Sequence, residues 1–160
     1  MRRRILAACL VGSLGLAAAL APAGEPSHEH AAAGGTAALS LNAGRPWSTD
    51  PPLRQGMTAI RTAVARDLPA IHGGTETSDQ YVALAATITG QVGYIVKNCK
   101  LEPAADAQLH RVIGELVAAA ETMRGAQPNM ARADGAARAV SALDAYGRYF
   151  AHPGWQALAH

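Results

Sequence analysis

Cysteine is scarce in this chain of 160 residues, which has Cys9 and Cys99 and no other. Cys9 lies in an amino-terminal segment that we expect to be cut off, so Cys99 is left without a partner for an intramolecular disulfide. All six histidines and three of the four methionines lie after that segment. We therefore expect the mature chain to keep soft and borderline metal ligands and to have no disulfide that stabilises its fold.

The amino-terminal segment has the composition of a cleaved signal peptide. Arg2–Arg4 form a positively charged start, residues 5–20 are uncharged and largely apolar, and residues 21–23 fit the small-x-small cleavage pattern. A membrane anchor is the rival interpretation, but the apolar run is rich in alanine and glycine and short for a span of about 20 residues. Lipidation at Cys9 is a minor alternative, because too few residues separate it from the last arginine. We expect residues 1–23 to be removed and the rest of the chain to be exported to the periplasm.

An excess of positive charge is also absent once the signal peptide is removed. The chain has 14 basic and 12 acidic residues, and residues 1–23 account for three of the arginines and none of the acids, which leaves a net charge of −1. The remaining arginines are scattered singly and form no stripe. We therefore expect no nucleic-acid partner and no membrane association after cleavage.

Motifs of the common enzyme classes are missing as well. The sequence has no Ser/His/Asp order, no paired-carboxylate motif, no phosphate-cradling glycine loop and no HExxH. Glu115 and Glu121 are most simply interpreted as solvated charges on a helix face. We expect a binding protein and not an enzyme.

No segment shows the alternation of polar and apolar residues that is typical of a strand. Residues 24–48 contain few large apolar side chains, and we expect them to form a flexible arm. From residue 49 onward the apolar residues recur at helical spacing, bounded by N-cap residues, prolines and glycines. Helices are predicted over about 49–72, 77–99, 102–124 and 131–151, the last of them ended by residues 152–154.

Four helices of about 20 residues with short connections most simply form an antiparallel up-down-up-down bundle, here over residues 49–160. In that all-α topology the starts of the first and third helices lie at the same pole as the ends of the second and fourth. Residues that are distant in the sequence are therefore expected to be neighbours at this pole.

Four candidate metal ligands fall at this pole: Met57, Cys99, His110 and His152. Thiolate, imidazole and thioether groups together form a soft set that suits Cu(I) and, less exclusively, zinc. Each residue also has a structural interpretation. Met57 can fill the core, Cys99 can act as a small buried hydrophobe, and the two histidines can cap or pair at helix ends.

Other groups of residues are weaker candidates. His72, Met123 and Met130 would form a thinner set at the opposite pole. His28 and His30 in the arm could act as an accessory site that captures a divalent metal or Cu(II) weakly.

Trp47 and Trp155 lie in the segments that lead into and out of the first pole, where they are expected to form a hydrophobic lid. The same surface could dock a partner or a second copy of the chain. A homodimer is therefore an open alternative.

Five glycines fall inside the predicted helices, where each costs about 0.5–1 kcal/mol relative to alanine. Close approach of helices is one explanation for them, and a flat cofactor between helices is another. These glycines are Gly56, Gly90, Gly93, Gly114 and Gly147.

A methionine about seven residues into the first helix and a histidine at the end of the fourth resemble the soluble periplasmic cytochrome b bundles. In that family the corresponding residues are the axial haem ligands. The resemblance therefore implies non-covalent haem b held by Met57 and His152. Cytochrome c-prime bundles share the architecture but need Cys-x-x-Cys-His, which this chain lacks.

Several longer segments resemble a group of small exported proteobacterial proteins labelled DnrO. They are Trp47-x-x-Asp50 with residues 53–57, Ile71-His72-Gly73-Gly74, residues 95–101, and His152-Pro153-Gly154-Trp155. This resemblance spans most of the mature chain and implies no mechanism. Taken together, the sequence favours a periplasmic four-helix bundle that binds or buffers a metal ion, with copper as the ion we favour, and it leaves a haem b electron carrier and a cofactor-free interaction module as alternatives.

Overall fold

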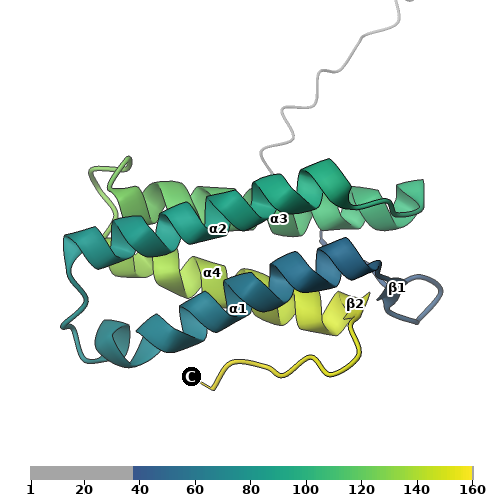
Figure 1. Cartoon of the computed structure of the whole chain (residues 1–160), viewed down its shortest axis with the longest axis horizontal. Helices are drawn as coiled ribbons and strands as arrows, with labels where there is room; N and C mark the ends of the chain where they lie inside the picture. Colours follow the sequence, from purple (N-terminus) through teal and green to yellow (C-terminus); the bar gives the residue numbers. More distant parts are fainter. Residues whose placement is uncertain (1–37, 160) are drawn as a thin grey trace, which may run out of the picture. The chain divides into compact units, whose positions relative to one another are not determined.

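The structure, a computed structural model, describes residues 38–159, so the predicted signal peptide, His28 and His30 lie outside the described residues. These residues form helices α1 (Pro51–His72), α2 (Ser78–Asn98), α3 (Pro103–Arg124) and α4 (Arg132–Tyr149). Two short strands, β1 (Trp47–Ser48) and β2 (Phe150–Ala151), flank them. The prediction of an all-α fold built from four helices is confirmed (Figure 1).

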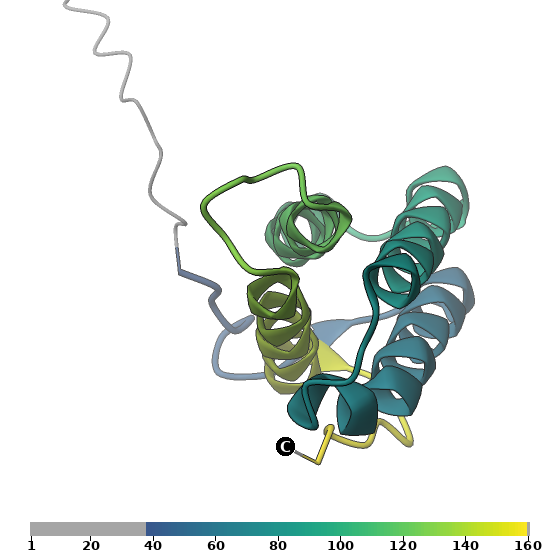
Figure 2. The same cartoon turned by 90° about the vertical axis from the view of Figure 1, so that its left-hand side faces the viewer.

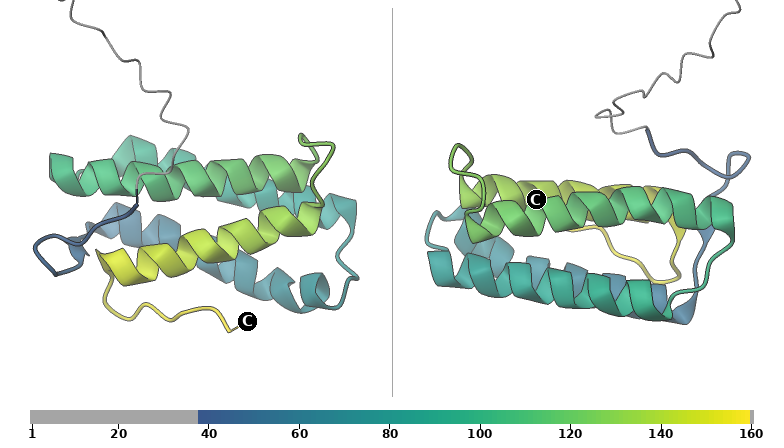
Figure 3. Two further views of the ribbon diagram at one scale, coloured as in Figure 1. Left: turned by 180° about the vertical axis from the view of Figure 1, so that it is seen from behind. Right: turned by 90° about the horizontal axis from the view of Figure 1, so that it is seen from above.

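The helices pack as a bundle in which consecutive helices run in alternating directions (Figures 1 and 3). Asp50, just before α1, accepts a hydrogen bond from the backbone N–H of Lys100, just after α2, at 2.6 Å. The hydroxyl of Thr49 donates to the carbonyl oxygen of Ala151 in β2 at 2.6 Å. The start of α1 therefore lies beside the ends of α2 and α4, and we call this end of the bundle the Cys99 end.

Local chemistry sets the helix boundaries. Asp50 caps α1 by accepting a hydrogen bond from Leu53 N–H at 2.9 Å, and prolines fill the first turn, where no N–H partner is needed. Thr77 and Gln80 form a capping box at the start of α2. Gly125 ends α3 with a φ of 80°, a left-handed conformation that favours glycine.

The core is mainly aliphatic and lies between the four helices, which Figure 2 shows end-on. Helix α4 contributes mostly small residues to it, and Gly135 lets α4 approach α3 closely, because a Cβ atom there would lie 2.7 Å from the carbonyl oxygen of Ala119. Among the described residues, no helix combines the length and the apolarity needed to cross a membrane. The largest fully buried side chains are Leu53, Met57, Ile60, Leu84, Ile88, Ile95, Leu109, Leu116, Met123, Leu143, Tyr146 and Phe150.

The structure departs from the expected elements at both ends of the bundle sequence. Phe150 and Ala151, expected in the fourth helix, are extended and pair in parallel with Trp47 and Ser48. The helix ends there because the buried ring of Phe150 stacks on that of Tyr146, with centroids 5.2 Å apart, while its backbone turns toward β1.

The described part of the expected flexible arm, residues 38–48, lies against the bundle. Leu39 packs against the core, and the indole N–H of Trp47 donates to the carbonyl oxygen of Ser40 at 2.6 Å. A tight turn between Asn42 and Arg45 closes this segment. This segment has few large apolar side chains, but two of them, Leu39 and Trp47, pack against the bundle.

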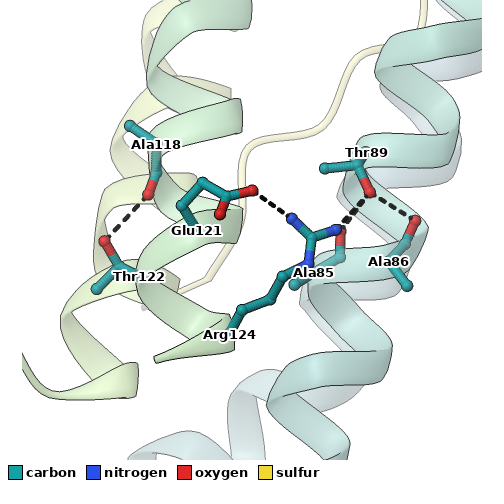
Figure 4. A network of polar contacts seen from close by, with 7 residues as sticks. All are labelled: Ala85, Ala86, Thr89, Ala118, Glu121, Thr122 and Arg124. Carbon is teal, nitrogen blue, oxygen red and sulfur yellow. Dashed lines mark hydrogen bonds and ion pairs between the residues drawn. The ribbon is translucent and has the colours of Figure 1, made fainter. Parts of the chain in front are cut away.

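At the end opposite Cys99, a polar clamp joins α3 to α2 (Figure 4). The guanidinium of Arg124 donates to the carboxylate of Glu121 at 2.6 Å and to the hydroxyl of Thr89 at 2.7 Å. It also donates to the backbone carbonyl of Ala85 at 3.3 Å. Because a planar guanidinium holds its donors in a fixed arrangement, this side chain sets the spacing of the two helices here.

We expect Arg124→Ala to lower the free energy of unfolding by about 1–2 kcal/mol, since it removes two contacts between helices and leaves their acceptors without this donor. Urea denaturation followed by circular dichroism measures this loss. Arg148→Ala, at an exposed position of α4, is the matched control and should change stability by less than about 0.5 kcal/mol. Equal losses in the two variants would contradict the clamp.

Candidate functional site

Cys99 is the residue at which α2 ends. Its backbone is extended, with φ −71° and ψ 140°, while its N–H still bonds to the carbonyl oxygen of Ile95 at 2.8 Å. The side chain is half-buried and its thiol is free of any disulfide. The neighbouring Lys100 N–H is the group that Asp50 holds, so the same carboxylate fixes where Cys99 sits.

Asp50 accepts hydrogen bonds from the backbone N–H groups of Lys100 at 2.6 Å and Leu53 at 2.9 Å, and the Cys99 thiol also helps to lower its pKa. Burial alone would raise its pKa. The hydrogen bonds and the charge of Arg54 outweigh burial and leave the Asp50 pKa below its ordinary value. At neutral pH Asp50 is therefore a carboxylate and acts only as an acceptor.

The thiol of Cys99 stays protonated at neutral pH. Burial, then the charge and hydrogen bond of Asp50, then the charge of Asp106 raise the pKa of Cys99 to about 12. Because the thiolate is the reactive form, the free thiol is a poor nucleophile at neutral pH. At neutral pH the proton is therefore on the sulfur atom of Cys99, and the nearby Asp50 is a carboxylate.

His110 lies on α3, one helical turn after Asp106, and its side chain is 67% exposed. Its Nδ1 lies 2.9 Å from the backbone oxygen of Asp106 and 3.3 Å from the Asp106 carboxylate. A carbonyl oxygen only accepts, so Nδ1 carries the hydrogen and the lone pair of the neutral ring is on Nε2. Asp106 therefore contacts His110 directly, and its charge also acts on the thiol of Cys99.

Met57 is fully buried in the aliphatic core, with 0% of its surface exposed. It lies seven residues after Asp50, which at 1.5 Å per residue is roughly 10 Å deeper along α1. The structure therefore places Met57 among core side chains and not beside the thiol of Cys99.

His152 follows β2 and contacts a different set of groups. Its Nδ1 is 2.9 Å from the hydroxyl oxygen of Tyr146, and its Nε2 is 3.4 Å from that of Thr58. Burial, and secondarily the charge of Arg54, lower the pKa of His152, which favours the neutral ring. Tyr146 is also close enough to Cys99 for the thiolate charge to contribute to its own raised pKa, whose main cause is burial.

The two tryptophans lie near this end of the bundle. Trp47 belongs to β1, and Trp155 packs edge-on against Tyr146, with ring centroids 4.8 Å apart. The indole of Trp155 sits on Gly147, where a Cβ atom would overlap it. A cavity of about 230 Å³ opens beside Asp50, and its other lining residues are Asn42, Trp47, Ser48, Thr49, Lys100, Leu101, Glu102 and Ala105.

The helix-interior glycines have two different environments. A Cβ atom on Gly56 would lie 2.5 Å from the side chain of Ile95, and one on Gly147 would overlap Trp155. At Gly90, Gly93 and Gly114 a Cβ atom would have open space around it. Close packing therefore explains the first two glycines, and nothing in the structure explains the other three.

The candidates at the opposite end differ in exposure. Met123 is fully buried, whereas His72 and Met130 are exposed. Within residues 38–159, no three side chains of histidine, cysteine, aspartate or glutamate lie together in an arrangement that could hold a metal ion as they stand. A larger cavity of about 740 Å³, between α3 and α4, is lined by none of the predicted site residues.

Two residues of the Cys99 end were not singled out from the sequence as site residues. Asp50 was interpreted only as a helix start, although the bundle topology already placed it opposite the end of the second helix. Tyr146 gave no such signal, because its contact with His152 depends on the chain leaving α4 at Phe150.

Comparison with known proteins yields no match: no family model, no curated protein and no solved structure is significantly similar to this chain.

We expect Cys99 to react with iodoacetamide far more slowly than an ordinary thiol, because its pKa of about 12 leaves little thiolate at pH 8. Asp50→Asn keeps the cap on α1 but removes the carboxylate charge, so the pKa of Cys99 should fall. Alkylation should then become faster by about three- to fourfold for each unit of that fall, because a less basic thiolate is also a weaker nucleophile. Mass spectrometry of timed reactions gives the rate. Asp79→Asn, at an exposed position of α2, is the control and should leave it unchanged.

We also expect Gly147→Ala to displace Trp155, because the new methyl group would occupy the place of the indole. The tryptophan fluorescence should shift to longer wavelength, and the free energy of unfolding should fall by about 1–3 kcal/mol, as for other overpacked sites. Gly114→Ala, where the structure has open space, should do neither. An unshifted spectrum in the Gly147 variant would show that Trp155 is not seated there.

Proposed function

We propose that the protein binds or buffers a metal ion at the Cys99 end, with copper as the ion and Cys99 and His110 as its principal ligands. The observation that supports this most is the position of the half-buried, disulfide-free Cys99 thiol at the end of α2, where the Asp50 carboxylate accepts a hydrogen bond from Lys100 N–H at 2.6 Å. A soft cation at this position would replace the thiol proton, and the carboxylates of Asp50 and Asp106 would balance its charge.

His110 supports the proposal through the direction of its hydrogen bond. Its Nδ1–H is directed to Asp106, which leaves Nε2 available as a ligand. Histidines that bind metals commonly donate their other ring N–H to a carboxylate or a backbone carbonyl in this way. Since the side chains do not already form a cage of three ligands, binding requires the exposed His110 side chain to turn toward Cys99.

The two other sequence candidates have a smaller part in this proposal. Met57 would have to leave the core, and His152, whose Nδ1 contacts Tyr146, would have to give up the contact of its Nε2 with Thr58. The same two changes would be needed for haem b, so we place the haem alternative second. We further propose that the protein acts in the periplasm, on the strength of its amino-terminal sequence, with His28 and His30 as an accessory capture site.

The test is a Cu(I) titration of the purified mature chain against a chromophoric competitor. We expect about one ion per chain, a loss of at least 100-fold in affinity in Cys99→Ser, and a loss of about 10- to 100-fold in His110→Gln. His72→Gln, at an exposed position on the opposite end, is the control and should keep the affinity.

The Cu(I) affinity measured in the same titration should rise with pH. The thiol is protonated well beyond neutral pH, so each ion bound should release one proton, and the affinity should rise about tenfold per pH unit between about pH 6 and 8. An affinity that is unchanged in Cys99→Ser would reject the site. A Soret band that appears with added haemin and is lost in Met57→Ala would favour the haem alternative instead.

A further inference from the structure

The segment after β2 forms an extended tail, residues 155–159, that lies beside α1 and α4 (Figures 1 and 2). Trp155 packs against Gly147 and Tyr146 of α4. Arg61 of α1 donates from Nε to the carbonyl oxygen of Gln156 and from a terminal nitrogen to that of Ala157. The tail is therefore held by the packing of Trp155 on α4 and by the hydrogen bonds from Arg61 of α1.

The tail has a defined direction along the bundle. His152 contacts Thr58, whereas the later residues Gln156 and Ala157 contact Arg61, which is further along α1. Leu158 then turns into the core, with 6% of its surface exposed. The tail thus runs parallel to α1, from the Cys99 end toward the other end of the bundle, and fills the first part of the seam between α1 and α4.

The seam continues as an open groove beyond the tail contacts at Arg61. A cavity of about 480 Å³ is lined by Leu68, Ile71 and His72 of α1 and by α4 residues between Ala133 and Asp144. On α4 the groove begins at Asp144, about one helical turn before Gly147, against which Trp155 packs. From Asp144 to Ala133 the groove is roughly 16 Å long, at 1.5 Å per residue of helix. An extended chain of the polyproline II type rises about 3.1 Å per residue and brings every third side chain to the same face, so this length accommodates about five residues.

The groove is apolar along its floor and acidic at its edges. Leu68, Ile71 and Val140 contribute the large apolar side chains, and alanines of α4 keep the floor shallow. Asp134 and Asp144 are the carboxylates among its lining residues, and His72 is the one basic side chain lining it. An occupant with apolar side chains and a positive charge complements these surfaces.

We infer that the groove between α1 and α4 is a docking site for an extended peptide segment of a partner protein, which carries apolar side chains three residues apart and a basic residue beside them. The tail supports an extended occupant, because it already lies in the same seam as an extended chain with two of its carbonyl oxygens bound by Arg61. It also supports the spacing, because its own anchors, Trp155 and Leu158, are three residues apart. This surface is separate from the proposed metal site.

The probe is a fluorescein-labelled peptide, acetyl-Leu-Lys-Ala-Leu-Lys-amide, added to the full chain and followed by fluorescence anisotropy. We expect saturable binding, with amide shifts in the ¹⁵N spectrum concentrated at residues 68–72 and 133–144. Ala137→Arg places a large cationic side chain at an exposed position in the groove and should weaken binding at least tenfold. Ala107→Arg, at an exposed position of α3, is the matched control and should leave it unchanged.

Several results would overturn the inference. Equal binding of acetyl-Leu-Glu-Ala-Leu-Glu-amide would remove the charge argument, and binding that ignores Ala137→Arg would place the peptide elsewhere. Absence of binding would reject the site. A concentration-dependent dimer that Ala137→Arg converts to monomer would show that a second copy of the chain covers the groove instead.

Discussion

The Asp50 carboxylate connects the parts of the molecule that matter most here. It caps α1 through Leu53 N–H and holds the chain that leaves α2 through Lys100 N–H. A single acidic group therefore joins two helix ends, and its charge adds to burial in raising the pKa of the neighbouring Cys99 thiol. Such a group is costly to bury without partners, and its hydrogen bonds supply them.

The same carboxylate gives the Cys99 end its chemical character. A thiol with a pKa raised to about 12 is not a nucleophile at neutral pH, so the site does not resemble that of a thiol enzyme. Burial and the negative charges of Asp50 and Asp106 make thiolate formation costly, and the two charges would favour a cation in place of the proton. The proposed metal site and the inert thiol are thus two consequences of one electrostatic arrangement.

The other side of the bundle is shaped by the small side chains of α4. Alanines and glycines let α4 pack closely on α3, and they provide little volume toward α1. The extended tail fills part of the resulting seam with Trp155 and Leu158, and the remainder is open as the groove near Leu68 and Ile71. Helix α4 therefore leaves space that another chain segment has to fill.

The sequence by itself determined the four helices, because apolar periodicity, N-caps such as Asp50 and Thr77, and ending glycines such as Gly125 are local signals. It also brought Cys99 and His110 to one pole through topology. Tertiary structure alone decided the rest: that Met57 is buried in the core, that Phe150 leaves the helix to pair with Trp47, and that Tyr146 takes His152 as its partner. These outcomes depend on depth, side-chain direction and contacts between distant segments, which the spacing of residues along one helix does not specify.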